Sequence, residues 1–313
     1  MLRRIADHLF WTARNLERAE WRARLAQVNY QLLIETPPRD LPPWEPLLAI
    51  FGEREAFFAP YTTPDEASVL NFFTLDARNP NSIRNCITIA RSNARALRHY
   101  ISSELWLDLN TLYLAAQQWT PEVFHSPGVF AFFAELKDSF YRIAGIKQST
   151  LPRDLAYDFM ELGMMLERAE DVSRMLDVKY HFLLPRLEDV GGAIDLLQWT
   201  AVLRSASGLE AYRKRFGSAI AVRNVVEILL FDATFPRSVR YSIERIETSL
   251  SRIAAGAPEK SPAAAAAGKL LEEIRTGRPT AIIRAGLHQF LLHIQDSCAE
   301  ISERVFQEYL KAV

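Results

Sequence analysis

Apolar residues recur at helical spacing along most of the chain. In the clearest example, Ile83, Ile87, Ala90, Ala94 and Leu97 follow one another at intervals of four and three residues, which places them on one face of an α-helix. No stretch has convincing strand or β-hairpin character. The pattern therefore predicts an all-α helical bundle. The predicted helices cover residues 2–34, 44–59, 65–73, 79–107, 108–120, 128–147, 153–183, 193–215, 218–231, 235–253 and 280–310.

Proline, glycine and capping residues mark the ends of these helices. The proline-rich stretch 37–43 follows the first helix, and proline cannot continue a helix. Asn79, followed by Pro80, has the pattern of an N-cap and first turn. Residues 256–261 are expected to form a loop. The five alanines at 263–267 either begin a helix after Pro262 or form a low-complexity spacer.

One pentapeptide occurs twice, as Leu16–Glu20 and as Leu166–Glu170, at an offset of 150 residues. Two further matches keep the same order: residues 80–84 resemble 236–240 at an offset of 156, and residues 132–139 resemble 290–297 at 158. Slowly drifting offsets are typical of an internal duplication with small insertions, although chance similarity between helical patterns is the alternative. We predict one all-helical domain over 1–313, with pseudo-repeats at about 1–150 and 151–313. A pseudo-twofold axis would relate them, with the two Glu-Arg helices at the centre.

Each copy of the pentapeptide places a carboxylate on an apolar helix face. Glu20 falls within the stripe formed by residues such as Leu9 and Leu16, and Glu170 takes the same place in the second copy. Burying a carboxylate without a partner lowers the stability of a fold by an amount on the order of several kcal/mol. Arg24 and Arg174 lie four residues further along their helices, where they can pair with these carboxylates.

Two interpretations of this constellation stay open. In the functional one, a pocket binds a substrate's amine and carboxylate, because glutamate can hold or deprotonate an amine and arginine binds carboxylates through two hydrogen bonds. In the structural one, a buried Glu-Arg network fixes the helix register. The functional interpretation assigns the catalytic role to Glu17 and Glu167, and substrate binding to Glu20, Arg24, Glu170 and Arg174.

A second polar stripe runs along the predicted helix 79–107. It consists of Arg84, Arg91, Arg95 and Arg98. The stripe could bind phosphate or an acidic peptide, with Glu104 beside it, or it could be a solvated or pairing face between helices. Arg240 is the counterpart of Arg84 in the second half, and we include it with Arg84, Arg91, Arg95 and Glu104 among the candidate substrate-binding residues.

Composition and motifs exclude several classes of protein. A net charge of −1 over 313 residues gives no basic field for nucleic acid, and no apolar run reaches the length needed to span a membrane. The two cysteines define neither a disulfide framework nor a zinc site, so we expect a cytoplasmic protein. A di-metal bundle needs Glu-x-x-His on two helices, whereas only Glu122–His125 fits. There is also no P-loop and no dinucleotide-binding motif, so no metal or cofactor is predicted in this chain.

Several motifs together resemble the bacterial alpha-E family, an all-helical domain named for its Glu-Arg motif. They are Phe10-Trp11 with Leu16–Glu20, Asn79-Pro80 with Arg84, Ser103–Trp106, Pro236–Arg240 and Leu287–Phe290. The resemblance covers essentially the whole chain. Two positions depart from the family pattern. Ala13 stands where a glycine usually precedes Arg14, and Met164 stands where an arginine is common. Arg14 is therefore a candidate binding residue without a counterpart in the second half.

The resemblance also implies a functional setting. Members of the family are typically encoded beside, or fused to, circularly permuted ATP-grasp ligases and transglutaminase-like proteins, which implies a part in peptide or amide-bond synthesis. The leading hypothesis is a cytoplasmic accessory subunit that binds the ligase, its peptide or its amino-acid product, with ATP and Mg²⁺ held only by the ligase. The alternatives are an acyl-transfer enzyme that uses Glu17 or Glu167 as base, and a non-catalytic scaffold. The oligomeric state stays open.

Overall fold

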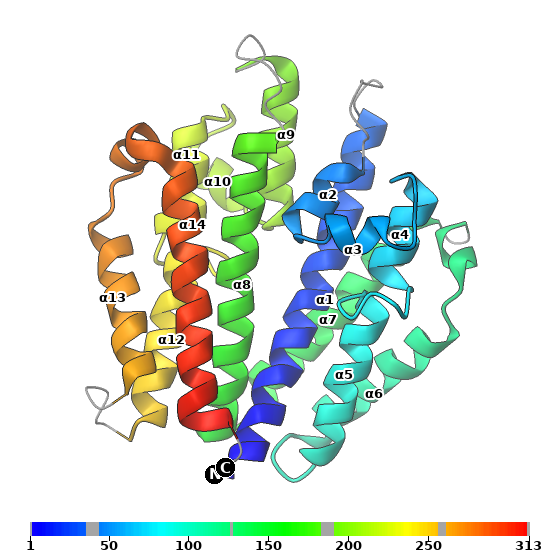
Figure 1. The fold of residues 1–313 in the computed structure, drawn as a ribbon, viewed down its shortest axis with the longest axis vertical. Helices are drawn as coiled ribbons and strands as arrows, with labels where there is room; N and C mark the ends of the chain where they lie inside the picture. The colour runs from blue at the N-terminus through cyan, green and yellow to red at the C-terminus, as the bar shows by residue number, and fades with distance from the viewer. Residues whose placement is uncertain (1, 36–43, 126–127, 183–190, 256–260, 312–313) are drawn as a thin grey trace. The chain divides into compact units, whose positions relative to one another are not determined.

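The computed structural model describes residues 2–35, 44–125, 128–182, 191–255 and 261–311, and every regular element within these ranges is helical (Figure 1). The predicted all-α class is confirmed. The chain divides into two compact units. The first comprises Met1–Leu48, Glu53–Met164 and Tyr309–Val313, and the second comprises Ala49–Gly52 and Met165–Glu308. The predicted pseudo-twofold axis concerns the placement of these units and stays a prediction.

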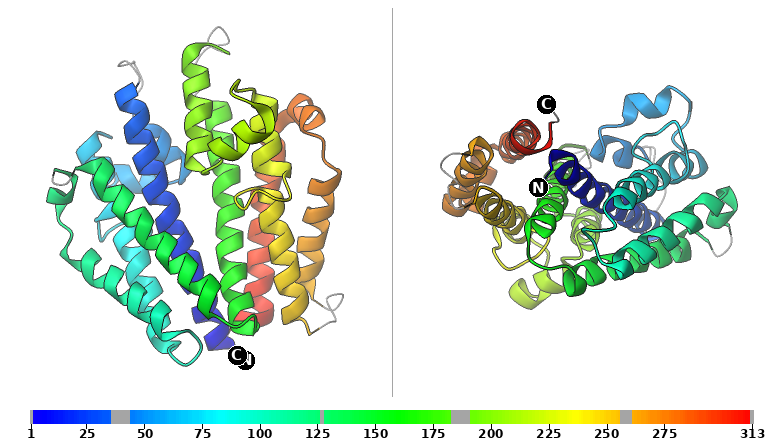
Figure 2. Two further views of the ribbon diagram at one scale, coloured as in Figure 1. Left: turned by 180° about the vertical axis from the view of Figure 1, so that it is seen from behind. Right: turned by 90° about the horizontal axis from the view of Figure 1, so that it is seen from below.

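A bundle of four helices, α1, α5, α6 and α7, forms the centre of the first unit. The long helix α1 packs along α5 and α7, and α6 packs against both of these (Figures 1 and 2). Large apolar side chains such as Phe10, Trp21 and Phe133 are fully buried in it, and their burial is the main stabilising contribution. The elements of this unit are α1 (Arg3–Glu35), α2 (Glu45–Ile50), α3 (Arg54–Phe58), α4 (Glu66–Thr74), α5 (Ile83–Ala96), α6 (Ser103–Gln118), η1 (Pro121–Phe124), α7 (Val129–Thr150) and the start of α8 (Leu155–Phe182).

The second unit contains the rest of α8 and the helices that follow it. Helix α13 packs against both α12 and α14 (Figure 1). His288 on α14 bonds Asp177 on α8 at 2.6 Å. The other elements are α9 (Ala193–Ser205), α10 (Leu209–Phe216), α11 (Val222–Val226), the π-helical turn η3 (Glu227–Phe231), α12 (Val239–Ile253), α13 (Pro262–Thr276), α14 (Pro279–Val305) and the start of the π-helical turn η5 (Phe306–Leu310).

The predicted helix over 79–107 is wrong at both ends. Ser82, not Asn79, is the N-cap of α5, because its hydroxyl accepts the backbone N–H of Asn85. The helix then ends at Ala96, and Ser102 caps a new helix by accepting the N–H of Leu105 at 3.2 Å. A serine side chain satisfies an N–H group that the first helical turn leaves without an acceptor, so each of these serines fixes a start that apolar spacing alone does not reveal.

Other predicted helices are interrupted at residues with left-handed backbone conformations. The helix predicted over 44–59 is two helices, with Gly52 at φ 64° between them, and that over 193–215 breaks near Ser207 at φ 50°. The final helix contains a kink at Gly286, where φ is 126°. Glycine tolerates such angles because it lacks a Cβ.

The alanine run lies inside α13, which begins after the N-cap Ser261 and Pro262, so the helical alternative for these residues is the correct one. The predicted proline-rich connection and most of the predicted loop 256–261 lie outside the described residues. No described helix is both long enough and apolar enough to cross a bilayer.

Candidate functional site

The first Glu-Arg motif forms a buried ion pair on α1. The Arg24 guanidinium donates to Glu20, and the two side chains are 3% and 8% exposed. Arg24 also donates to the Tyr141 hydroxyl at 3.1 Å and lies over the Tyr141 ring, with its Cζ 5.5 Å from the ring centroid. Burial lowers the pKa of Arg24, but the Glu20 carboxylate and Tyr141 outweigh it, so the pKa is raised above its ordinary value. The Arg24 guanidinium therefore stays charged and bound to Glu20 and Tyr141 within the first unit.

The second motif forms the same pair in a more open setting. Arg174 donates to Glu170 at 3.3 Å, but the Arg174 side chain is 41% exposed. The Glu170 carboxylate is buried like its counterpart. Identical pentapeptides thus produce one enclosed pair and one pair with a solvent-accessible cation.

The two glutamates predicted to be catalytic are both buried. Glu17 is 3% exposed and Glu167 is 4% exposed. Arg14, also 6% exposed, lies over the rings of Phe10 and Trp11 at 5.8 and 5.5 Å from its guanidinium carbon, an arrangement typical of a cation–π contact. A general base must reach the proton that it abstracts. The burial of these side chains favours the structural interpretation of the motif.

The arginine that follows Glu17 or Glu167 binds the turn before a capped helix. Arg18 donates to the Asn81 side chain at 3.0 Å, and Arg168 donates to the Pro236 carbonyl at 3.1 Å. These acceptors lie just before the caps of α5 and α12, Ser82 and Ser238. Each motif arginine therefore joins a central helix to the start of a neighbouring helix in its own unit.

The turns before α5 and α12 also have the same pattern of local hydrogen bonds. Asp76 accepts the backbone N–H of Arg78, and Asp232 accepts that of Thr234, in both cases two residues further along. Arg84 and Arg240 each donate to the carbonyl of the residue nine positions earlier at 3.4 Å. Arg84 also donates to the Ala116 and Trp119 carbonyls near the end of α6. These two arginines, predicted to bind substrate, thus bind backbone oxygens.

Sequence reasoning missed the two aspartates. Asp76-Ala77 matches Asp232-Ala233 at the same offset of 156 that relates Pro80 to Pro236. Extending the comparison four residues toward the N-terminus would have found them. An aspartate two residues before an N–H group is a common local turn, because its carboxylate accepts that hydrogen bond.

The Asp76 turn should make stability depend on pH. The Arg78 side chain holds the pKa of Asp76 at about 2, below its ordinary value of 3.8. Because the pKa of Asp76 is lowered in the folded state, the ionised carboxylate stabilises the fold. This contribution to stability is fully present above pH 3.8 and is lost as the pH falls through about 2. Asp76→Asn should therefore be less stable than the wild-type chain at pH 5, and urea titrations should show the difference closing toward pH 2. Asp138→Asn, at an exposed position, is the control and should be as stable as the wild-type chain at both pH values. If the loss of stability in Asp76→Asn were the same at pH 5 and pH 2, the role given to the Asp76 carboxylate would be wrong.

Comparison with known proteins shows the family. The model of the Alpha-E family, described as a predicted alpha-helical domain with a conserved ER motif, matches residues 1–310. The chain belongs to the Alpha-E family. Uncharacterized proteins of Mycobacterium bovis and of two Mycobacterium tuberculosis strains are 24% identical to it over 277 residues, which is 83% of this chain. The chain spans about a third of these relatives, 31% of their length. No solved structure matches.

In this Alpha-E chain, Glu17-Arg18 and Glu167-Arg168 fit the description of the family's ER motif. Each pair combines a buried glutamate with an arginine that binds the neighbouring turn. The relation between the motif and the turn is therefore a concrete structural role for the motif in each unit.

The Alpha-E chain also contains buried ion pairs that its sequence did not reveal. Arg22 binds Glu53 through two hydrogen bonds of 2.9 and 2.6 Å, and Asn79 and Asn81 donate to the same carboxylate. Arg22, Asn79 and Asn81 each lie at most 31 residues from Glu53 in the sequence, but none lies on the same helix as Glu53. Helical spacing therefore does not predict these contacts. In the second unit, Lys179 pairs with Asp195 at 2.9 Å, and burial lowers the pKa of this lysine despite the carboxylate.

Met164, where the resemblance leads us to expect an arginine, contacts another such pair. Lys147 binds Glu161 at 2.7 Å, and its ammonium lies 3.9 Å from the Met164 sulfur. The position therefore contributes to the surroundings of a buried lysine in the first unit.

The arginine stripe of α5 is organised by the aromatic residues of α6. Arg91 donates to Asn110 at 3.1 Å and lies over the rings of Trp106 and Tyr113. Arg98, in the turn after α5, also lies over the Trp106 ring, with its guanidinium carbon 5.5 Å from the ring centroid. The remaining members, Arg95 and the predicted neighbour Glu104, are both exposed. Among the described residues, no group of three or more potential metal ligands comes together.

Proposed function

We propose that this chain is the helical accessory domain of an ATP-grasp-type amide or peptide ligase system. The length of its relatives carries this proposal. They match the chain over only 31% of their own length, so in those proteins the helical domain is joined to a much longer polypeptide. A domain that forms part of a larger chain in its relatives is suited to working with a second domain, in this proposal the ligase.

An accessory role fits the chemistry of the Glu-Arg motifs. Glu17 and Glu167 are buried, and Glu20 is already paired with Arg24. Their contribution is then to hold the domain's shape, while the ligase supplies ATP, Mg²⁺ and the activated acyl group. The proposed location is the cytoplasm, and a transglutaminase-like protein is a second candidate partner.

The face formed by α5 and α6 is the surface that we assign to the partner. It combines the guanidinium groups of Arg91, Arg95 and Arg98 with the exposed apolar side chains of Leu107 and Leu114, 60% and 56% exposed. Arg91 is already oriented by Trp106, Tyr113 and Asn110. Aromatic residues, arginine and apolar anchors are enriched at protein interfaces, and the excess of positive charge selects an acidic surface on the ligase or its peptide.

Reconstitution tests this proposal. The purified chain is mixed with its ATP-grasp ligase, ATP, Mg²⁺ and amino acids; association is followed by gel filtration and product by mass spectrometry. The chain should co-elute with the ligase and raise product formation. Arg91→Gln combined with Arg95→Gln should weaken association by about tenfold or more, as expected for the loss of two charged contacts. Arg223→Gln, at a 64% exposed side chain in the other unit, should not.

Two outcomes would overturn it. If the chain neither co-elutes nor changes product formation, the accessory role is wrong and the scaffold interpretation is favoured. If Glu17→Gln and Glu167→Gln variants remain folded and bound to the ligase but abolish product, the chain is itself an acyl-transfer enzyme.

A further inference from the structure

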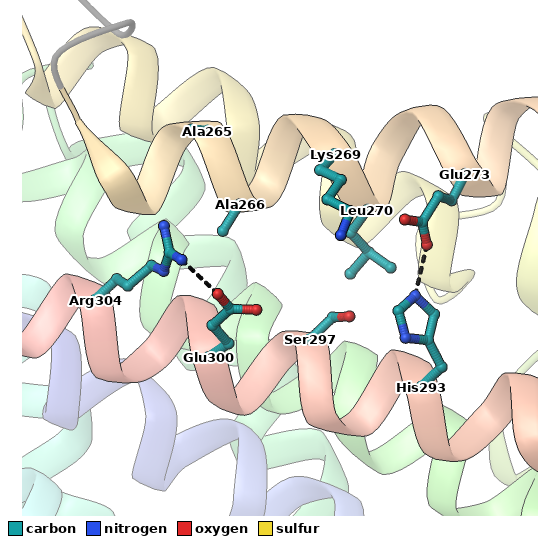
Figure 3. A pocket seen from close by; sticks show the side chains of 9 residues that line it. All are labelled: Ala265, Ala266, Lys269, Leu270, Glu273, His293, Ser297, Glu300 and Arg304. Atoms are coloured by element: carbon teal, nitrogen blue, oxygen red, sulfur yellow. Dashed lines mark hydrogen bonds and ion pairs between the residues drawn. The ribbon is translucent and has the colours of Figure 1, made fainter.

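A groove lies between α13 and α14 in the second unit (Figure 3). Its volume is about 260 Å³, just below the range of pockets that hold drug-sized molecules. It is therefore suited to a smaller ligand. The lining residues are Ala265, Ala266, Lys269, Leu270, Glu273, His293, Ser297, Glu300 and Arg304.

A hydrogen-bonded pair of one basic and one acidic side chain stands at each end of the groove. Arg304 donates to Glu300 at 2.5 Å at one end, and His293 bonds Glu273 at 2.5 Å at the other. Arg304 is further anchored by donating to the Pro262 carbonyl at 3.0 Å. The four side chains are between 36% and 54% exposed, and exposed pairs of this kind are weak. Their carboxylates can therefore accept a second cation without losing a strong contact.

The middle of the groove holds two donors. Lys269 and Ser297 project toward the space between the helices from opposite sides (Figure 3). Neither side chain has a hydrogen-bond or ion-pair partner among the described residues. A lysine ammonium next to a hydroxyl is a suitable site for a carboxylate, because both groups donate to its oxygens.

Charge and space define the rest of the ligand. The two acidic residues of the lining, Glu273 and Glu300, match the two basic residues Lys269 and Arg304 in number, so the groove favours a ligand without net charge over a phosphate dianion. Figure 3 shows the small side chain of Ala266 opposite Glu300, whereas the Leu270 side chain lies beside the Lys269 ammonium, on the side toward Glu273 and His293. The space beside Ala266, between the Lys269 and Ser297 donors and the Glu300 carboxylate, is therefore the part of the groove that we assign to the ligand.

We propose that this groove binds a small zwitterion, an amino acid or dipeptide, with its carboxylate on Lys269 and Ser297 and its ammonium on Glu300. The inference rests on the proposed function, because it names the substrate or product class that the domain would hold for an amide ligase. It assigns that ligand to the α13–α14 groove, at a distance in sequence from the Glu-Arg motifs.

The test is a titration of the full chain with the dipeptide alanyl-alanine, followed by calorimetry and by backbone NMR shifts. We expect a dissociation constant in the millimolar range or below, with shifts centred on α13 and α14. Acetylating the peptide's amine or amidating its carboxylate should each weaken binding by about tenfold or more, as does the loss of one charge-assisted hydrogen bond. Two results would overturn the proposal. One is equal affinity for the free dipeptide and for both blocked dipeptides; the other is no binding at about 10 mM, the highest practical concentration.

Variants locate the ligand within the groove. Lys269→Met keeps the length of the side chain and removes its charge, and it should weaken the free dipeptide more than the amidated one. Glu300→Gln should weaken the free dipeptide more than the acetylated one. The matched controls are Glu272→Gln, beside the groove residue Glu273 but outside the lining, and Lys214→Met on α10. Circular dichroism verifies that each variant is folded. Equal effects of the control and groove variants would place the ligand elsewhere and contradict the assignment.

The titration contains no ligase, so its outcome is separate from that of the reconstitution. If the dipeptide fails to bind while the chain still co-elutes with the ligase, only the groove assignment is wrong. If the dipeptide binds but no ligase associates, the accessory function is wrong and the groove remains a binding site.

Discussion

Replacing Gly163 by alanine should lower the free energy of unfolding by about 2–4 kcal/mol, toward the upper end of the range for overpacked sites. A Cβ at this position would lie 2.3 Å from the carbonyl oxygen of Phe10 on α1. No side-chain rotation can relieve this contact, because the obstructing atom is backbone. The first turns of α8 and helix α1 would have to move apart, and urea denaturation of the purified variant would measure the loss.

A second glycine provides the matched control. Gly145 lies in α7, and a Cβ there would meet no atom within 4 Å. Gly145→Ala should stabilise the chain by about 0.5–1 kcal/mol, since alanine loses less backbone entropy than glycine in a helix. If Gly163→Ala were as stable as the wild-type chain, the close approach of α8 to Phe10 would be incorrect.

Removing the positive charge from the buried pair of the first motif should have an effect of similar or greater size. Arg24→Met leaves the Glu20 carboxylate buried without its guanidinium partner, and the loss of one member of a buried pair costs about 3–5 kcal/mol. The double variant Glu20→Leu/Arg24→Met should recover at least half of this loss, because the buried carboxylate is removed together with the guanidinium that it binds. Thermal and urea unfolding of the wild-type chain, the single variants Glu20→Leu and Arg24→Met, and the double variant complete this double-mutant cycle.

The second motif is the natural comparison for this experiment. Arg174 is 41% exposed where Arg24 is 3% exposed, so Arg174→Met should cost only about 1 kcal/mol or less, as for solvent-exposed pairs. Equal losses for Arg24→Met and Arg174→Met would show that burial does not distinguish the two copies. A stable Arg24→Met chain that no longer supports ligation would instead favour a direct functional role for the first motif.

The candidate site was predictable only where its members lie on one helix. Glu20 with Arg24 and Glu170 with Arg174 pair at the i,i+4 spacing that the sequence predicts. By contrast, Arg22 with Glu53 joins residues from separate elements, and the groove depends on the packing of α13 beside α14. The helical period specifies which side chains are neighbours on one helix, but it does not specify which other helix packs against them.

The sequence by itself determined the all-α class, the position of most helices and the repeated Glu-Arg pentapeptide, because these depend on side-chain spacing within single segments. Helix starts at Ser82 and Ser102, and breaks at Gly52 and Gly286, were decided by individual hydrogen bonds and backbone angles. Only the tertiary structure decided that Arg18 and Arg168 bind the turns before α5 and α12, and that Arg24 is enclosed while Arg174 is open. The physical reason is that burial and long-range pairing depend on how the helices of each unit pack.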